Sequence, residues 1–465
     1  EGREGGREGE RELLGMEMRR RVRLHSWQPD EAPAYTLPPS DLALRQILVF
    51  LRHGDRCPIS PSAGKLHLDQ DFWKSKLPSQ TETERWDALF PVNGPAAPID
   101  ARQSPWGYLT AEGARQCEEL GKALRRRYGE ALRVESVRAT NIRRTQQSAQ
   151  NVLLGLLTPD ARVQPMVPVS VRDWPRETLV PNTIACPPLR ALLRAAARPS
   201  TTPLREHIAA ALGYDESARD GRGFRIDQAR EVLMCLQAHE AHAGGSDVAG
   251  LPPGVSIEDV EALLELNYAE WQAKWGSTLE MQRLAIGALL GEIRQAMAKV
   301  TRRLTASVDA AEDEDDGIEL HLFAGHDLTI VPLLFALGAR DGSFPRYASH
   351  LVIEVATRID SARIRAAGEK STHADHAFVR VLYDGRPLRL TAHGFSGSAW
   401  LPWRAWLAML EPTALTPAEY RAICAWDIES DFSDQPPRVD ESLEDTLTGA
   451  GRRSTLNLAP PASKL

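Results

Sequence analysis

Two histidines with charged neighbours carry the clearest chemical signal in this sequence of 465 residues. His53 lies in the run Arg52-His-Gly-Asp-Arg-Cys-Pro58, and Asp327 directly follows His326. Arginine offers planar, permanently charged donors that bind phosphate oxygens in pairs, so arginines close to a histidine on both sides indicate a dianionic ligand. A neutral imidazole can attack phosphorus when a backbone carbonyl holds its other ring nitrogen. The residue types therefore predict a site for attack on a phosphate.

Each residue of these two motifs has an expected role. We expect His53 to be the nucleophile and Asp327 to be the proton donor, because a carboxylic acid must protonate the leaving alkoxide. Arg52, Arg56 and His326 are expected to bind the phosphate oxygens and to neutralise the charge that develops on them in the transition state. The sequence shows no ligand cluster with metal spacing, so we expect neither a metal nor another cofactor.

Both motifs are expected to follow β-strands. The apolar run 46–51 has the β-branched and aromatic content of a strand buried on both faces, and 320–324 is also predicted to be a strand. In an open α/β sheet, ligands bind just beyond the carboxyl ends of the strands, where residues distant in sequence converge. Gly54 and Gly325 would allow tight turns at these points. The two histidine motifs are therefore predicted to meet at one edge of a sheet.

Strand and helix signals alternate on either side of the motifs. This alternation predicts an α/β fold with a three-layer core, in which a mixed, mostly parallel sheet is flanked by helices, plus an inserted, mostly helical cap. Between about 170 and 301 the β signal fades and the periodic segments are helical. The remaining core elements are predicted as helices at 111–127, 145–156 and 328–337 and as strands at 134–138, 351–355 and 378–383.

Composition suggests how the chain is divided. The first residues are of low complexity and the first methionine is Met16, so whether the residues before it belong to the natural protein stays open. The end of the chain is again polar. We expect a disordered N-terminal extension at 1–41, an α/β core at 42–169 and 300–434, a helical cap insertion at 170–299 and a flexible C-terminal tail at 435–465.

Charge and hydropathy exclude some classes of partner. The formal net charge is -7, from 56 Lys and Arg against 63 Asp and Glu. Proteins that bind nucleic acid usually carry an excess of basic residues, so we do not expect a nucleic-acid partner. No stretch approaches the roughly 20 apolar residues of a transmembrane helix, and the given N-terminus has no secretory signal. We therefore expect a cytoplasmic protein, with a mitochondrial location as the alternative because of the Arg-rich start at 18–23. The oligomeric state stays open.

Several other features have ordinary structural explanations. The 5 cysteines are an odd number without a C-x-x-C pair, and we expect mostly free thiols in a reducing compartment. His239 and His242 are three positions apart, whereas a helical two-histidine metal site needs four, so we interpret them as polar side chains on the surface of a helix. Trp271 and Trp275 are expected to pack internally, and the acidic run 312–316 is expected to be a solvated loop.

The two motifs resemble the signature of the histidine acid phosphatase family, R-H-G-x-R-x-P near the N-terminus with a later H-D pair. The run 52–58 fills every fixed position of the first motif, and 326–327 fills the second. The segment 137–145 is similar to the family's V-R-S-T segment, with Ala139 where serine is usual. The resemblance implies that Arg138 is a third phosphate ligand. It also implies an acid phosphatase that hydrolyses phosphomonoesters through a phosphohistidine intermediate.

Within that family, the sequence looks most like the lysophosphatidic acid phosphatase branch. The matches are 180–182 with Cys186, 331–334 and 415–424. The resemblance implies a small-molecule phosphomonoester substrate, with a lysophospholipid as the expected one. Such a ligand needs an apolar groove, for which Leu77, Leu89 and Phe90 are candidate lining residues, with internal packing as the alternative for them.

Other substrates and functions remain as alternatives. Asp55 and the run 344–347 also resemble the branch that acts on phosphoxylose, so a phosphosugar or inositol-phosphate phosphatase stays possible. A phosphoglycerate-mutase-like enzyme would use glutamate as its proton donor, and Asp327 favours the acid phosphatase branch. A pseudoenzyme that only binds phosphate esters would be expected to lack His53, Asp327 or an arginine, and all are present.

Overall fold

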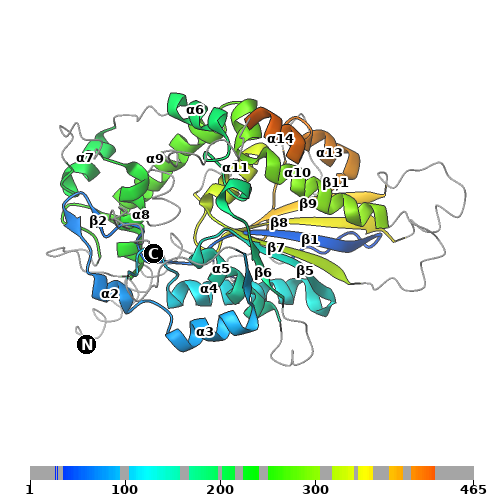
Figure 1. The fold of residues 1–465 in the computed structure, drawn as a ribbon, viewed down its shortest axis with the longest axis horizontal. Coiled ribbons are helices and arrows are strands. Elements are labelled where there is room, and N and C mark those ends of the chain that lie inside the picture. The colour runs from blue at the N-terminus through cyan, green and yellow to red at the C-terminus, as the bar shows by residue number, and fades with distance from the viewer. Residues whose placement is uncertain are drawn as a thin grey trace, which may run out of the picture.

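A mixed sheet of nine strands organises the part of the chain that the computed structural model describes (Figure 1). Strands β4, β6, β5, β7 and β1 lie side by side and run parallel, while β8, β9 and β10 extend the sheet from β1 with antiparallel pairing. β11 pairs with β9. The described residues are Trp27, Pro29, 35–94, 104–157, 167–196, 202–214, 224–239, 250–303, 317–339, 344–359, 376–390 and 400–424.

The predicted strands are present, and the mixed, mostly parallel sheet is confirmed. The four shortest strands, β4, β6, β10 and β11, were not predicted because segments of two or three residues are too short to show a periodicity. The nine strands are β1 (Leu42–Arg52), β4 (Val92–Asn93), β5 (Leu132–Ala139), β6 (Val169–Val171), β7 (Ile318–Gly325), β8 (His350–Arg358), β9 (Ala377–Tyr383), β10 (Arg386–Pro387) and β11 (Leu401–Pro402).

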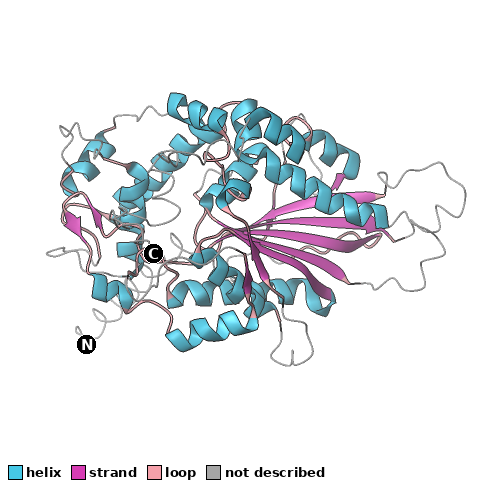
Figure 2. Ribbon diagram, in the orientation of Figure 1, coloured by secondary structure: helices cyan, strands magenta, loops and turns pink. Residues whose placement is uncertain are grey.

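Helices cover both faces of the sheet, as Figure 2 shows, which confirms the three-layer core. Successive residues of a strand point to opposite faces. Ile47, Val49 and Leu51 of β1 therefore pack in one buried cluster, together with residues of the helices α4 (Ala111–Tyr128) and α5 (Arg143–Leu156). Leu48 and Phe50 pack in the other, together with residues of α10 (Leu279–Arg303), α11 (Asp327–Ala336) and α13 (Trp403–Leu410).

A helical group forms a separate hydrophobic cluster away from the sheet (Figure 1). It consists of α7 (Pro203–Ala211), α8 (Ile226–His239) and the first half of α9 (Ile257–Trp275). The hairpin β2 (Ser62–Ala63) and β3 (Leu66–His67) and the helix α2 (Gln70–Lys74) pack against them. We call this group the cap. The described structure also contains α3 (Gln80–Leu89), α6 (Pro187–Ala196), α14 (Pro417–Cys424) and the short helices η2 (Gly129–Ala131) and η3 (Trp174–Arg176).

The cap and the sheet do not divide where the sequence suggested. α10 begins inside the predicted insertion 170–299, yet Ile286, Leu289 and Ile293 pack in the cluster that covers the sheet. Conversely, 62–74 joins the cap although it belongs to the predicted core. The division of the chain into domains stays a prediction.

Two aromatic residues of the predicted N-terminal extension 1–41 pack on the sheet. Trp27 is buried, its backbone N–H donates to Tyr347 O at 2.9 Å, and its ring lies 4.7 Å from that of His350. Tyr35 donates a hydrogen bond to Glu354 Oε1 at 2.8 Å. Both residues therefore contact the core, although they fall within the predicted extension. Residues 1–26, the acidic run 312–316 and the tail 435–465 lie outside the described residues.

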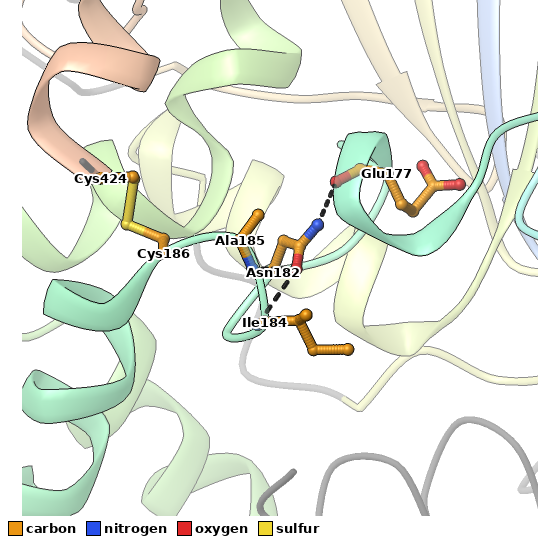
Figure 3. The surroundings of a disulfide bond; sticks show 6 residues. All are labelled: Glu177, Asn182, Ile184, Ala185, Cys186 and Cys424. Atoms are coloured by element: carbon orange, nitrogen blue, oxygen red, sulfur yellow. Dashed lines mark hydrogen bonds between the residues drawn. A yellow bond between two sulfur atoms is a disulfide. The ribbon is translucent and has the colours of Figure 1, made fainter. Parts of the chain in front are cut away.

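A disulfide joins Cys186, just before α6, to Cys424 at the end of α14 (Figure 3). Nearby, Asn182 Oδ1 accepts hydrogen bonds from the backbone N–H groups of Ile184 and Ala185, which fixes the turn before Cys186. Mostly free thiols were expected, and the other three cysteines are free and buried, but the disulfide between these two was not predicted. Because disulfides persist mainly in oxidising compartments, the bond weakens the case for a reducing one. The cytoplasmic location stays a prediction.

None of the described helices combines the length and the apolar character needed to cross a bilayer.

Two glycines bring the loop after β1 against the start of α4. A Cβ atom on Gly54 would lie 2.2 Å from Gly113 O, and one on Gly113 would lie 2.0 Å from Asp55 O. Real Cβ atoms do not approach backbone oxygens this closely, so both positions require glycine. The close contact fixes the loop that carries His53 against a helix in the core.

Candidate active site

His53 follows the last residue of β1, where the sheet holds it beside the second histidine motif. Its backbone N–H donates to Gly325 O at 3.0 Å, and the His53 and His326 rings lie 5.4 Å apart. His53 Nδ1 lies 2.8 Å from Gly54 O. Because a carbonyl oxygen only accepts, Nδ1 must carry the proton, which leaves Nε2 with a free lone pair. The predicted carbonyl support for a nucleophilic imidazole is therefore present.

The environment keeps both histidines neutral. Burial, and then the positive charge of Arg144, lowers the pKa of His53 well below its usual value. The same two causes lower the pKa of His326. His326 Nε2 lies 2.9 Å from Thr140 Oγ1, which orients the ring. A neutral His53 keeps its lone pair even in mildly acidic solution.

Asp327 begins α11 and is contacted by two arginines. Its Oδ2 lies 3.5 Å from Arg52 Nη2 and 3.9 Å from Arg230 Nη2. Both guanidinium groups stack on aromatic rings of the segment 344–347: Arg52 lies 4.3 Å from the centroid of Tyr347, and Arg230 lies 4.1 Å from that of Phe344. These contacts fix the position of the carboxyl group next to His326.

Arg52 belongs to the site but does not line its pocket. It is buried, and Nη1 donates a hydrogen bond to Pro345 O. Since it lies behind Asp327 rather than among the residues that line the pocket, the structure supports contact with Asp327 more directly than contact with a phosphate.

Arg56 lines the pocket and is paired with Glu231 of α8. Burial opposes the positive charge of Arg56, but Glu231 outweighs it and raises the pKa of the guanidinium. The same Glu231 oxygen, Oε1, accepts a hydrogen bond from the backbone N–H of Ile59 at 2.9 Å. A residue of the cap thus fixes both the arginine and the loop that carries it.

The structure does not bring Arg138 into this pocket. Arg138 lies within β5, where Nη1 contacts Glu292 Oε2 at 2.6 Å and Nη2 contacts Thr178 Oγ1 at 2.6 Å. Glu292 and Thr178 line a different cavity, of about 870 Å³. Ala139, the departure from the family pattern, is buried on the opposite face of the strand, as alternation requires.

Arg144 lies where the resemblance had implied Arg138. It is buried at the start of α5 and lines the pocket together with His53 and His326. Burial, and then the nearby Arg56, lowers the pKa of Arg144 to about 9. Sequence reasoning missed this residue, although the rule that ligands bind beyond strand ends also pointed to the residues after β5.

The rest of the pocket is polar and comes largely from α8 and the segment before it. Its only aliphatic lining residue among those described is Ile59, and the expected groove residues Leu77, Leu89 and Phe90 do not line it. The described lining residues are His53, Arg56, Ile59, Ser60, Arg144, Arg225, Asp227, Gln228, Arg230, Glu231, His326 and Asp327.

His239 has a partner that the surface interpretation did not foresee. Its Nε2 lies 2.6 Å from Asp55 Oδ2, and Thr110 Oγ1 donates to the same carboxylate oxygen. Burial opposes protonation of His239, but Asp55 outweighs it and raises the pKa of the imidazole. This contact ties the end of α8 to the loop after His53. His242 lies outside the described residues.

Within the described residues, no group of His, Cys, Asp and Glu is arranged to hold a metal ion. Independence from metals stays a prediction.

We predict that Arg144, and not Arg138, binds a phosphate in this pocket. Arg144→Met keeps most of the side-chain volume but removes the charge, and should weaken binding of inorganic phosphate by roughly tenfold or more, the cost of a charge-assisted hydrogen bond. Arg138→Met is the matched control and should change the dissociation constant less than about threefold. Isothermal titration calorimetry measures both, and equal losses in the two variants would contradict the assignment.

Three comparisons place the chain among known proteins. It is 25% identical over 462 residues to a probable acid phosphatase of Schizosaccharomyces pombe, and the match covers 85% of this chain and 96% of that protein. It is 27% identical over 340 residues to lysophosphatidic acid phosphatase type 6 of Bos taurus, covering 68% of this chain and 74% of the relative. Among solved structures, the phytase from D. castellii is similar with a TM-score of 0.51, 14% identity and 88% coverage of both chains, which shows the shared fold.

The family model of the histidine phosphatase superfamily (branch 2) matches residues 43–384, which include both histidine motifs and Arg144. The chain therefore belongs to branch 2 of the histidine phosphatase superfamily and is a hydrolase of phosphoric monoesters.

Proposed function

We propose that this phosphatase works through a phosphohistidine formed on Nε2 of His53. The observation that carries the proposal is the 2.8 Å contact between His53 Nδ1 and Gly54 O, which fixes the tautomer and leaves Nε2 unprotonated. The lowered pKa of the imidazole supports the same state in acid. A nucleophile that is already deprotonated needs no separate base.

The reaction has two steps in which His53 is first modified and then restored. Nε2 attacks phosphorus, the bond between phosphorus and the ester oxygen breaks, and the leaving alkoxide takes a proton from Asp327. Water then attacks the phosphohistidine, releases inorganic phosphate and returns a proton to Asp327. Arg56, Arg144 and His326 are the lining groups that can stabilise the charge on the phosphoryl oxygens in both transition states.

Arg52 and Arg230 act through Asp327 in this proposal. Both approach its Oδ2, at 3.5 Å and 3.9 Å, and both are fixed by stacking on aromatic rings. They are therefore positioning residues for the proton donor.

A covalent intermediate on His53 is the first test. Rapid alkaline quenching of the enzyme with labelled phosphomonoester should trap a phosphoenzyme that is stable in alkali and labile in acid, because a phosphoramidate has these properties. His53→Ala should abolish both the trapped label and turnover, while His67→Ala, at an exposed position of the cap hairpin, should retain them. Label on a serine, cysteine or aspartate would contradict the mechanism.

The second test concerns Asp327 as the proton donor. Asp327→Asn cannot donate the proton, so turnover of esters with poor alkoxide leaving groups should fall by roughly a hundredfold or more. Nitrophenyl phosphate, whose leaving group needs little protonation, should be affected much less. The measurement is kcat/KM of the wild-type enzyme and of the variant on an alkyl ester and on nitrophenyl phosphate. Equal losses would remove Asp327 from this role.

Within the class of phosphomonoesters, lysophosphatidic acid is a more specific candidate for the substrate. The observation that favours it is the similarity to relatives named lysophosphatidic acid phosphatase type 6 in Bos taurus and Homo sapiens. The polar lining of the pocket suits the phosphate and glycerol part of such a molecule, and the acyl chain would have to leave the pocket. The same lining also suits a phosphosugar.

A chain-length series tests the lipid candidate. If the protein buries the acyl chain, each methylene should add about 0.8 kcal/mol, so kcat/KM should rise steeply with chain length. The rate must be measured below the concentration at which micelles form. A flat series, with phosphosugars turned over equally fast, would reject lysophosphatidic acid and leave the phosphatase mechanism unaffected.

A further inference from the structure

One wall of the phosphate pocket has no role in the hydrolysis described above. The segment that begins α8 contributes Arg225, Asp227 and Gln228 to the lining. One turn further along the same helix, Arg230 and Glu231 contact Asp327 and Arg56. Residues three or four positions apart lie on the same helix face. Asp227 and its neighbours therefore face the pocket from the same side as the groups that support catalysis.

Asp227 is held in a fixed orientation by α9. Its Oδ1 accepts a hydrogen bond from Asn267 Nδ2 at 2.8 Å and another from Trp271 Nε1 at 3.0 Å. Both donors are buried, Asn267 completely. Two hydrogen bonds to one oxygen prevent rotation of the carboxylate, so the orientation of the other oxygen is fixed as well.

The second oxygen of Asp227 is available. Within the described part of the chain, no hydrogen bond or ion pair reaches Oδ2. Its neighbours are already engaged: Gln228 donates to Ser62 O at 3.1 Å and accepts from Tyr214 at 3.4 Å, and Arg225 also has a partner. Asp227 thus presents a preoriented acceptor to whatever enters the pocket.

The chemistry of the pocket limits what this acceptor can bind. An ionised carboxylate only accepts hydrogen bonds and repels the phosphate, so its partner must be a donor on the leaving group. Arg225 and Arg230 line the same pocket and disfavour a cationic amine. A neutral hydroxyl group satisfies both conditions.

We propose that Asp227 determines specificity by accepting a hydrogen bond from a hydroxyl group of the leaving group. The preferred substrates are then phosphomonoesters of polyols, in which a hydroxyl lies close to the ester oxygen. This inference rests on the proposed function, because it assigns a leaving-group site beside the phosphate that His53 attacks. Glycerol phosphates, their monoacyl derivatives and phosphosugars all carry such a hydroxyl.

The test compares a hydroxylated substrate with its deoxy analogue. The wild-type enzyme should turn over glycerol 3-phosphate with a kcat/KM at least about tenfold above that for propyl phosphate, as expected for a hydrogen bond to a charged group. In Asp227→Asn the ratio should fall towards one. The asparagine oxygen is still held by Asn267 and Trp271, so the contact between α8 and α9 is retained while the pocket receives an N–H group instead of an acceptor.

A surface variant provides the matched control. Asp71→Asn makes the same change of charge on a side chain that is 92% exposed on α2, and it should leave the ratio unchanged. Thermal unfolding reports whether Asp227→Asn is folded, and the ratio in the wild-type enzyme tests the proposal without any variant.

Two results would overturn this inference and leave the proposed function unaffected. They are a wild-type ratio near one, and equal losses on both substrates in Asp227→Asn, which would assign Asp227 a purely structural role. Nitrophenyl phosphate distinguishes these from failure of the proposed function. If the wild-type enzyme hydrolyses nitrophenyl phosphate but shows no preference for glycerol 3-phosphate over propyl phosphate, only the leaving-group site is rejected. If the enzyme does not hydrolyse nitrophenyl phosphate, both the phosphatase mechanism and this inference are rejected.

Discussion

Buried positive charge beside neutral histidines is the constraint on which the site depends. Arg56 and Arg144 line the pocket with little contact with water, and burial, followed by the charge of Arg56, lowers the pKa of Arg144 to about 9. Glu231 pairs with Arg56, and Arg144 lies close enough to Arg56 for the two positive charges to repel each other. Neighbouring positive charges that are buried are unfavourable, so the pocket favours a dianion. Burial, together with the positive charge of Arg144, lowers the pKa of His53, which keeps the imidazole unprotonated and therefore nucleophilic.

This arrangement makes the cap part of the catalytic structure. Glu231 and Arg230 lie on α8, yet they contact Arg56 after β1 and Asp327 after β7. The loop after His53 is also fixed from the core, since Gln116 of α4 accepts from the Asp55 N–H at 2.9 Å and Ser148 of α5 accepts from the Gly54 N–H at 3.1 Å. Support from several elements reduces the movement of the nucleophile loop, which is what preorganised catalysis requires.

Much of the fold and the centre of the site could be predicted from the sequence because they depend on local patterns. Buried strands give continuous apolar runs, and polar residues directly after them mark the edge of the sheet, which located His53 and Asp327. Arg138 was assigned as a phosphate ligand from its place in a short family motif, but its position within β5 directs its side chain towards Glu292. Position relative to the strand end was the better guide, because it points to the segment that contains Arg144.

Other contacts could not be predicted because they depend on how distant elements pack. Nothing near Glu231 in the sequence indicates Arg56, and the pair forms only when α8 packs beside the loop after β1. The disulfide joins cysteines separated by 238 positions, and the odd number of cysteines gave no reason to pair them. Cap residues contribute to the site through tertiary packing, for which a single sequence contains no short-range signal.

The position of α8 also explains how one mechanism can serve different leaving groups. Arg230 and Glu231 contact Asp327 and Arg56, whereas Asp227 lies one turn earlier on the same helix, lines the same pocket and contacts neither of them. A substitution at Asp227 can alter the hydrogen bonds offered to the leaving group without changing the ion pair between Arg56 and Glu231, provided that the helix itself does not move. The contacts of Asp227 with Asn267 and Trp271 oppose such movement. Selection of the leaving group and attack on phosphorus therefore share one helix but depend on different residues of it.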